Sequence, residues 1–499
     1  MSGGRRPRRS PVGAPPRRAD LRGDTIVATA TAPGRGALAV IRVSGPDAHT
    51  IVRRCTTPWP TTARHVARVR LHAADHPDAP LDEAMVTWFA APRSFTGEDL
   101  VECTVHGGAF VPAAVVAAFV AAGARPALPG EFTERAVRHG KLDLLRAEAI
   151  GDLIDARTTA SHRLALRQLD GVLTGHLAAL REAVLGAEAL IAYDLDFPSE
   201  DDGPLDPARV LAAVDGTIAA IDTLLATLPQ AVLGRDGVTV VLAGAPNAGK
   251  SSLFNALVGE SRALVSEVPG TTRDAIEVLL DDDPWPIRLV DTAGLRTSDD
   301  QVERLGIEVS HRRLAEAQVV LVCGEDDASL ARGVVEVRAH SAAPVVRVRT
   351  KGDRATDTGP APIEARAASE PTVSRPIGSP PLASPHASSL VDDTLITVSV
   401  VTGAGLVALR DTLRATVRAT TPDPAESAPV VTRARHVAAL TTARAELEAF
   451  RGVWADGALP APVAATHLRA ATLALDELLG ALDVEEVLDR VFRAFCIGK

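Results

Sequence analysis

Apolar and polar positions alternate with a period of two in the N-terminal part of the chain. The alternation is seen in residues 99–105, and three further short segments, 25–31, 38–43 and 83–90, also predict strands. Such alternation is typical of strands with one buried face. A turn at Pro33–Gly36 separates residues 25–31 from 38–43, and an apolar helix is expected over 110–120. We therefore predict a small α+β domain over residues 24–130.

After Glu131 the apolar spacing changes to three and four residues. One face collects Leu166, Leu169, Leu173, Leu177, Leu180 and Val184, which predicts one long amphipathic helix. A second helical run reaches about residue 233, and the same pattern resumes after Val431. Residues 131–235 and 421–499 are thus expected to form one helical domain, with a separate domain inserted over 236–420. Such insertions are tolerated where the chain ends lie close together and exposed.

Two further segments lack any apolar period. Residues 1–23 carry seven arginines among prolines and glycines and are expected to be a disordered basic tail. This tail could contact RNA or remain a solvated arm. Residues 355–389 are rich in Ala, Pro and Ser and predict a flexible loop without chemistry.

Composition limits the partners and the compartment. Of 499 residues 46% are hydrophobic but only 3% aromatic, so the cores must be built from Ala, Leu and Val. The formal net charge of −10 gives no global attraction to nucleic acid, so any RNA contact needs a local patch or a partner. Four scattered cysteines without a Cys-x-x-Cys pair favour the reducing cytoplasm. The 109–124 segment, taken as the longest apolar stretch, is shorter than the ~20 residues of a membrane span, so no membrane association is expected.

The clearest motif is Gly244-Ala-Pro-Asn-Ala-Gly-Lys-Ser251, which fits G-x-x-x-x-G-K-[ST]. A predicted strand over 238–243 precedes it and a predicted helix over 252–258 follows. Backbone N–H groups of such a turn converge on phosphate oxygens, and the helix N-terminus adds its positive dipole end. Lys250 would contact the β- and γ-phosphates, and Ser251 would bind Mg²⁺.

Further nucleotide motifs follow in the order that a Ras-like GTPase requires. Thr272 lies in Gly270–Asp274 and could complete the Mg²⁺ shell. Asp291-Thr-Ala-Gly294 follows a predicted strand; Asp291 could hold the metal through water and the Gly294 N–H could reach the γ-phosphate. Together with a final base-side loop over 399–403, these motifs predict an α/β nucleotide-binding domain.

Thr350-Lys-Gly-Asp353 is a variant of the Asn-Lys-x-Asp motif that recognises guanine. The carboxylate of Asp353 can accept hydrogen bonds from N1–H and the amino group of guanine, whereas adenine would present an acceptor. This predicts GTP rather than ATP. Thr350 can keep one hydrogen bond of the usual Asn but not a second, which predicts weaker nucleotide affinity.

Leu295 follows the Asp-Thr-Ala-Gly string where Ras proteins hold a water-orienting Gln. A leucine side chain cannot form hydrogen bonds, so another polar group must orient the attacking water. Glu303 is the catalytic candidate, although a solvated surface glutamate fits the same residues. Arg42 and Glu102 likewise lie within predicted strands, either as charges at the rim or as ligand contacts.

At this point the chain resembles the MnmE (TrmE) family of tRNA-modification GTPases, within the wider TrmE-Era-EngA-YihA-Septin-like GTPases. Beyond the nucleotide motifs, the resemblance lies in the strings 24–28, 33–36, 94–99, 106–108, 129–135, 141–144, 147–150, 196–198 and 495–499. It implies a multidomain α/β protein: an N-terminal α+β folate-binding domain, a helical domain and an inserted Ras-like P-loop G domain.

The resemblance also implies an activity. Such proteins are homodimers that join the FAD-dependent protein MnmG in a heterotetramer. They add a carboxymethylaminomethyl or aminomethyl group at C5 of the wobble uridine of certain tRNAs. The one-carbon unit comes from 5,10-methylene-tetrahydrofolate, for which 5-formyl-tetrahydrofolate is a bound analogue, and GTP hydrolysis with Mg²⁺ and K⁺ closes the G domains.

Residue by residue, the family's sites fall on named positions. Folate contacts fall on Arg42, Glu102, Lys141 and Lys499, and Cys496 beside them is a further candidate. K⁺ ligands fall on Asn247, Ser266, Val268 and Thr271, and Glu303 is the family's catalytic glutamate. The expected GTP contacts are Asn247, Ala248, Gly249, Lys250, Ser251, Ser252, Ser266, Thr271, Thr272, Asp291, Thr292, Ala293, Gly294, Thr350, Lys351, Asp353, Ser399, Val400 and Val401.

Two other functions share some of these features. A GTP-dependent ribosome-assembly or RNA-binding factor would share the nucleotide motifs, but it needs an RNA module that the sequence does not indicate. A folate-dependent enzyme with a merely regulatory G domain would share the folate contacts. Binding of 5-formyl-tetrahydrofolate would distinguish the tRNA-modification GTPase from the RNA-binding factor. Loss of wobble modification in a Glu303→Ala strain would distinguish it from the folate enzyme with a regulatory G domain.

Overall fold

The computed structural model describes residues 23–196, 207–260, 276–291, 311–354, 394–421, 429–455, 460–480, 491–492 and 495–498. The chain divides into two compact units. Unit 1 comprises residues 1–151, 168–221 and 433–499, and unit 2 comprises 152–167 and 222–432. This division into two units does not test the domain boundaries that the sequence pattern gave, which stay predictions.

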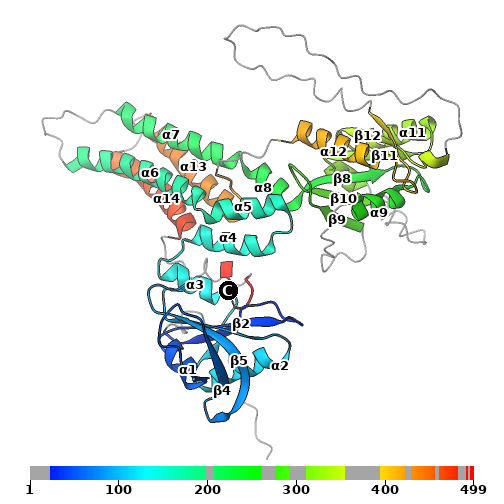
Figure 1. Cartoon of the computed structure of the whole chain (residues 1–499). Helices are drawn as coiled ribbons and strands as arrows, with labels where there is room; N and C mark the ends of the chain where they lie inside the picture. The colour runs from blue at the N-terminus through cyan, green and yellow to red at the C-terminus, as the bar shows by residue number, and fades with distance from the viewer. Residues whose placement is uncertain are drawn as a thin grey trace, which may run out of the picture. The chain divides into compact units, whose positions relative to one another are not determined.

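Unit 1 begins with a seven-stranded sheet in the order β3-β4-β5-β6-β2-β1-β7 (Figure 1). All neighbouring strands are antiparallel except β1 and β7. The strands are β1 (Ile26–Thr29), β2 (Leu38–Ser44), β3 (Thr56–Thr57), β4 (Ala67–Ala73), β5 (His76–Phe89), β6 (Leu100–His106) and β7 (Arg125–Pro126). Helices α1 (Ala48–Arg54) and α2 (Phe110–Ala121) contribute to its apolar core. The four predicted strands and the predicted helix are confirmed.

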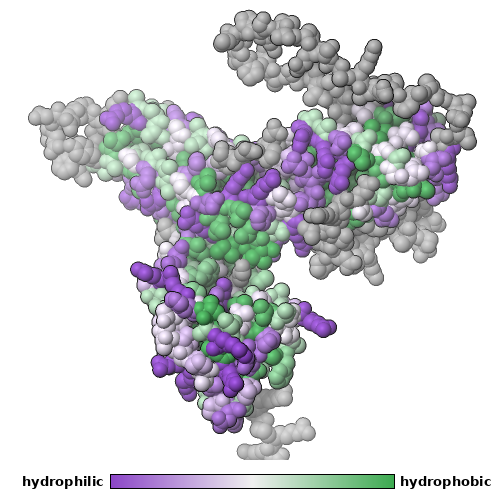
Figure 2. Space-filling model, viewed as in Figure 1, coloured by the Kyte–Doolittle hydropathy of each residue, from purple (hydrophilic) through white to green (hydrophobic). Residues whose placement is uncertain are grey.

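Helices make up the rest of unit 1. They are α3 (Glu131–Arg138), α4 (Leu144–Asp155), α6 (Val172–Asp196), α7 (Pro207–Leu225), α13 (Ala434–Ala455) and α14 (Ala461–Leu479). Helix α14 packs against both α6 and α13. Segments from both ends of the chain therefore build one helical body. On the visible face, hydrophobic side chains gather where α4 lies (Figure 2).

The prediction of one helix through Leu166 and Val184 is wrong. Helix α5 (Thr159–Leu169) ends before Gly171, and α6 starts at Val172. Gly171 has a φ of 84°, a left-handed conformation that a helix interior excludes. From Leu173 on the apolar stripe is buried, whereas Leu166 is exposed.

Helix α13 is joined to α4 by a buried ionic cluster. The Glu148 carboxylate accepts two hydrogen bonds from Arg435, at 2.6 and 2.7 Å, and one from His436 Nε2 at 2.9 Å. Burial opposes its charge, but the bonds from His436 and Arg435 lower the pKa of Glu148 to about 2. Burial lowers the pKa of His436, although the hydrogen bond to Glu148 opposes this shift. The cluster fixes the start of α13.

One helical stretch, Pro207–Asp236, is long and apolar enough to cross a membrane by length and composition. The 109–124 segment, which holds helix α2, is a shorter apolar helix, whereas Pro207–Asp236 is longer but includes charged residues such as Arg209, Asp215 and Asp222. Core helices pass the same test. Along α7 the side chains of Val210, Val214, Ile218 and Ile221 are buried, which is typical of a core helix.

Unit 2 contains a six-stranded sheet in the order β13-β12-β11-β8-β10-β9. Its elements are α8 (Leu228–Asp236), β8 (Val238–Ala243), α9 (Lys250–Glu260), β9 (Ile276–Leu280), β10 (Ile287–Asp291), β11 (Val319–Gly324), α11 (Asp327–Arg338), β12 (Val345–Arg349), β13 (Leu395–Thr397) and α12 (Leu406–Thr420), besides α5. All pairs are parallel except β9 with β10. The predicted strand over 238–243, the predicted strand before Asp291 and the helix after the P-loop are confirmed.

The parallel sheet is buried on both faces, which explains the continuous apolar run of β8. Val240 and Leu242 join one apolar cluster, and Val241 and Ala243 join the other. After β8 the chain adds β9 and β10 on one side and β11 on the other. The carboxyl end of β8 is thus a topological switch point, where ligands of open α/β sheets bind.

Candidate functional sites

The P-loop follows β8 and shows why its glycines are required. Gly244 has a φ of 131°, and a Cβ there would overlap the Cys323 carbonyl oxygen of β11. Gly249 has a φ of 79°, and a Cβ would lie 3.3 Å from the Thr350 Cβ. Buried Lys250 donates to the carbonyl oxygens of Gly244 and Ala245, both at 2.8 Å. The turn is shaped to present backbone groups and one ammonium to phosphates.

Thr350 connects the base loop to the P-loop. Its hydroxyl donates to the Ala248 carbonyl oxygen at 2.8 Å and lies 3.3 Å from the Gly324 carbonyl oxygen. The side chain is buried, with 3% exposed. The threonine therefore holds the two loops together through its single donor, whereas an asparagine amide could donate twice.

Asp353 is oriented for a ligand at the same edge of the sheet. Ser399 Oγ donates to Asp353 Oδ1 at 2.8 Å, and this hydrogen bond lowers the pKa of Asp353. Lys351 has a φ of 57° and forms an ion pair with Glu325. An ionised, exposed carboxylate beside the P-loop matches the donor edge of guanine.

Asp291 ends β10 next to β8, opposite Leu242, and is buried with 1% exposed. With Ser251 at the start of α9 it offers oxygen ligands of the kind that Mg²⁺ takes together with phosphates and water. Among the described residues no cluster of three or more His, Cys, Asp or Glu side chains could hold a metal. The donor set suits a nucleotide-bound Mg²⁺.

Several predicted nucleotide-site residues lie outside the described residues. They are Ser266, Val268, Thr271, Thr272, Thr292, Ala293, Gly294 and Glu303. Asn247, the remaining K⁺ candidate, has a φ of 61° at the tip of the P-loop. Exposed Ser252 lies in α9, and Val400 and Val401 follow Ser399 as exposed residues.

A second site lies in unit 1, on the strands β2 and β6. Arg42 and Glu102 face each other across these strands, and Arg42 Nε donates to Glu102 Oε1 at 2.8 Å. The guanidinium carbon of Arg42 also lies 5.6 Å from the ring centroid of Phe95. The two charges that the sequence placed separately in strands are therefore one cross-strand pair.

Glu102 lines a pocket of about 500 Å³. The lining residues are Arg64, Phe89, Arg93, Ser94, Phe95, Leu100, Glu102 and Lys141. Phe89, Phe95 and Leu100 give it an apolar wall, whereas Arg64, Arg93 and Lys141 are exposed. Lys141 Nζ donates to the Pro92 carbonyl oxygen at 3.2 Å. A planar ligand with N–H donors and an anionic tail fits this distribution of charge.

Two of the four predicted folate residues thus line the pocket, and Arg42 reaches it through Glu102 and Phe95. Lys499 lies outside the described residues. Cys496 is exposed and does not line the pocket, but its carbonyl oxygen accepts from the Gly130 N–H at 3.2 Å. Arg64, Arg93 and the aromatic residues were not predicted. The string 94–99 indicated the loop beside Arg93, whereas Arg64 carries no local signal.

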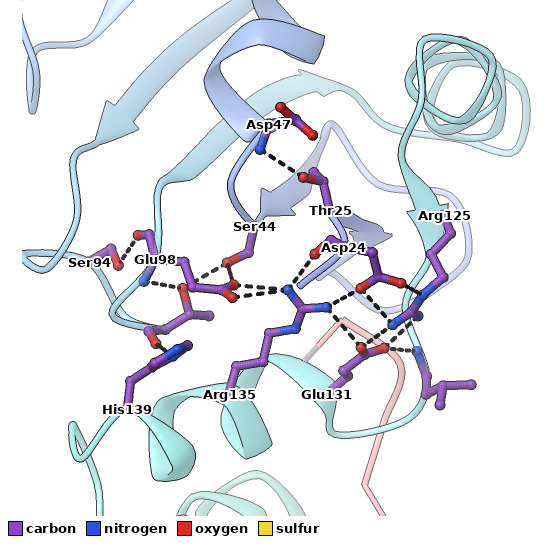
Figure 3. Close-up of polar contacts among 12 residues, drawn as sticks. Asp24, Thr25, Ser44, Asp47, Ser94, Glu98, Arg125, Glu131, Arg135 and His139 are labelled. Atoms are coloured by element: carbon purple, nitrogen blue, oxygen red, sulfur yellow. Dashed lines mark hydrogen bonds and ion pairs between the residues drawn. The ribbon is translucent and has the colours of Figure 1, made fainter. Parts of the chain in front are cut away.

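The loop between β5 and β6, residues 90–99, contributes Arg93, Ser94 and Phe95 to the pocket and is held by polar contacts (Figure 3). Ser44 at the end of β2 donates to Glu98 Oε2 at 2.9 Å and lies 2.7 Å from Thr96 Oγ1. His139 Nδ1 bonds the Thr96 carbonyl oxygen at 2.8 Å. These contacts fix the positions of Ser94 and Phe95.

Behind this loop lies the Arg135 network, formed by Asp24, Glu98, Arg125, Glu131 and Arg135 (Figure 3). Arg135 donates to Glu98 Oε2 at 3.0 Å and to Asp24 Oδ1 at 2.7 Å. Arg125 pairs with both Asp24 and Glu131. Burial opposes the charge of Glu131, yet the Arg125 hydrogen bond lowers its pKa. The network ties α3 to β1 and to the loop.

Comparison with known proteins shows the family of the chain. The model for the MnmE helical domain matches residues 144–496, and that for the GTP-binding protein TrmE N-terminus matches residues 25–141. The chain belongs to the MnmE family of tRNA-modification GTPases. It is 40% identical to the tRNA modification GTPase MnmE of Methylobacterium radiotolerans over 481 residues, 95% of this chain and 99% of that protein.

A second relative belongs to the same family. The MnmE protein of Neisseria meningitidis serogroup C is 38% identical over 485 residues, again 95% of this chain and 99% of that protein. Among solved structures, the G domain of the T. maritima FeoB iron transporter is 22% identical and covers 36% of this chain and 99% of that chain, with a TM-score of 0.25. The family, with its GTP-hydrolysing tRNA-modification activity, agrees with the resemblance seen in the sequence.

Proposed function

We propose that this MnmE-family chain uses its pocket on β2 and β6 to bind a one-carbon tetrahydrofolate for tRNA modification. The observation that carries the proposal is a pocket lined by both Lys141 and Glu102, with Glu102 paired to Arg42 of the neighbouring strand. Glu102, whose Oε1 accepts a hydrogen bond from Arg42, also accepts hydrogen bonds from the pterin amino and ring N–H groups. Lys141 binds the anionic tail, and Phe89 and Phe95 cover the ring.

In this proposal the bound folate supplies the one-carbon unit that is added, with the FAD-dependent partner MnmG, at C5 of the wobble uridine. The chain acts as a cytoplasmic homodimer within a heterotetramer. Its G domain is inserted into the helical domain, as the return of residues 433–499 to unit 1 supports.

For GTP, Lys250 holds the phosphates and Asp353 the guanine base, whereas Glu303 orients the attacking water. Ser251 and Thr272 would hold Mg²⁺, and Asn247, Ser266, Val268 and Thr271 would hold K⁺. Both cations would neutralise charge on the phosphates. Lys499 completes the folate contacts, and Cys496 stays a candidate beside them.

The direct test is binding of 5-formyl-tetrahydrofolate by calorimetry. Wild-type chain should bind it, and Glu102→Gln should weaken binding about tenfold or more, because one charged acceptor is lost. Glu83→Gln is the matched control, since Glu83 lies exposed on β5 and pairs with Arg68 outside the pocket. Equal affinity of wild type and Glu102→Gln would contradict the assignment.

A further inference from the structure

The pocket is lined by more positive residues than Lys141, the one cation among its lining residues that the sequence predicted. Besides Lys141, Arg64 and Arg93 line the pocket. Neither of these two arginines forms an ion pair with a carboxylate in the described part of the chain. Three exposed cationic residues therefore line the pocket, together with one carboxylate, Glu102, and the aromatic residues Phe89 and Phe95.

Arg64 is held at this pocket by its backbone as well as by its side chain. Its φ is 62°, a left-handed conformation that costs a residue with a Cβ ~1 kcal/mol or more. The Arg64 N–H donates to the Trp88 carbonyl oxygen at 2.8 Å, next to Phe89. Its Nη2 donates to the Arg93 carbonyl oxygen at 2.6 Å. A strained residue fixed at a pocket is a pattern found at ligand clamps.

Most of the guanidinium of Arg64 remains available to a ligand. It has five N–H donors, and the bond to Arg93 uses one of them. The fork of an arginine matches a carboxylate in two parallel hydrogen bonds. Since the Arg93 carbonyl orients this fork, Arg64 is preset for an anion rather than merely solvated.

We propose that Arg64 determines specificity for the ligand's tail, together with Arg93 and Lys141, and that the preferred ligand is a polyglutamylated reduced folate. The inference rests on the folate function proposed above. A single glutamyl tail offers two carboxylates, fewer than the three cationic residues that line the pocket. Each further γ-linked glutamate adds one carboxylate, so a tail of two or more residues satisfies all three.

The test compares three probes in titrations of the full chain: 5-formyl-tetrahydropterin without a tail, 5-formyl-tetrahydrofolate, and its triglutamate. Wild type should bind the triglutamate most tightly. Arg64→Gln should lose about tenfold in affinity for the triglutamate and keep its affinity for the tail-less pterin, because one charge-assisted carboxylate contact is lost. Arg53→Gln, an exposed arginine on α1 outside the pocket, should behave as wild type.

A second variant covers the risk that residue 64 is needed for folding. Arg93→Gln keeps the carbonyl that Arg64 contacts and removes only a side-chain charge, and it should lower triglutamate affinity in the same selective way. If both variants bind the triglutamate like wild type, the assignment of Arg64 is wrong. It is also wrong if their affinity for the tail-less pterin falls as much as their affinity for the triglutamate. If wild type binds none of the probes, the folate function itself is wrong.

Discussion

At the scale of single residues, Asp353 carries the choice of base. Its carboxylate, ionised and held by Ser399, can accept two hydrogen bonds from guanine. We expect Asp353→Asn to weaken GTP binding roughly 10- to 100-fold, because charged hydrogen bonds contribute about 1.5–3 kcal/mol each. Fluorescent-nucleotide titration measures this, with Asp411→Asn on the exposed face of α12 as control. Unchanged GTP affinity would contradict the role of Asp353.

Glu148 predicts how stability depends on pH. Its pKa in the folded chain is about 2, below the ordinary value of 4.5. A lowered pKa stabilises the fold above pH ~4.5, and this stabilisation, roughly 3 kcal/mol, is lost as pH falls toward 2. Denaturant unfolding of the wild type at about pH 5 and at about pH 3 measures this, and the free energy of unfolding should be lower at the lower pH.

Glu148→Gln should remove this acid dependence and cost about 3–5 kcal/mol at neutral pH, because Arg435 would remain with an uncharged partner. Glu448→Gln is the control: it breaks a half-exposed pair with Arg444 on α13 and should cost no more than about 1 kcal/mol. A variant that unfolds at wild-type denaturant concentration with an unchanged acid slope would show that the cluster does not anchor α13.

At the scale of elements, the segment 495–498 depends on one glycine. Gly498 has a φ of 95°, and a Cβ would lie 2.8 Å from the Ala30 Cα and overlap the Thr29 carbonyl oxygen. Gly498→Ala should therefore displace the segment from β1. Hydrogen exchange at the Gly130 N–H, which bonds the Cys496 carbonyl, should become about tenfold faster or more, for a strain of ~1–3 kcal/mol.

Gly452→Ala on α13 is the matched control, because a Cβ there meets nothing within 4 Å. It should leave the Gly130 exchange rate unchanged. Wild-type protection of Gly130 in Gly498→Ala would mean that the segment tolerates a side chain, and the docking derived from the contacts would then be wrong.

How far the elements could be predicted depended on whether their signals were local. The apolar run of β8 and the motif after it predicted strand, turn and helix because each feature lies within a few residues. Strand β4 was missed although Val69 and Leu71 alternate with exposed Arg68 and Arg70, so a period-two signal was present. The break at Gly171 was hidden because the leucine spacing continues across it.

The sites show the same limit. Arg42 and Glu102 could be singled out as charges within strands, but their pairing needed the register of β2 against β6. Arg64 could not be found, since only folding brings it to Arg93 and Phe89. Thr350 could be interpreted from its motif, and its bond to the P-loop agrees with the single donor expected.

At the scale of the whole molecule, the proposed K⁺ site predicts a salt effect. GTP hydrolysis should be about tenfold faster or more in KCl than in NaCl at equal ionic strength, because a cation at Asn247 would stabilise charge on the phosphates. Asn247→Ala should lose most of this difference. Steady-state phosphate release measures both rates, and a wild-type rate indifferent to the exchange of salts would contradict the potassium assignment.

Both sites on one chain must serve a single reaction if the account is right. The most direct measurement is nucleoside analysis of tRNA from a strain that lacks its own MnmE and expresses this chain. Wild type and Glu83→Gln should restore the modified wobble uridine, whereas Glu102→Gln in the folate pocket and Asp353→Asn in the base loop should each reduce it about tenfold or more. Full modification with Glu102→Gln, at wild-type protein level, would contradict the central claim that this pocket supplies the one-carbon unit.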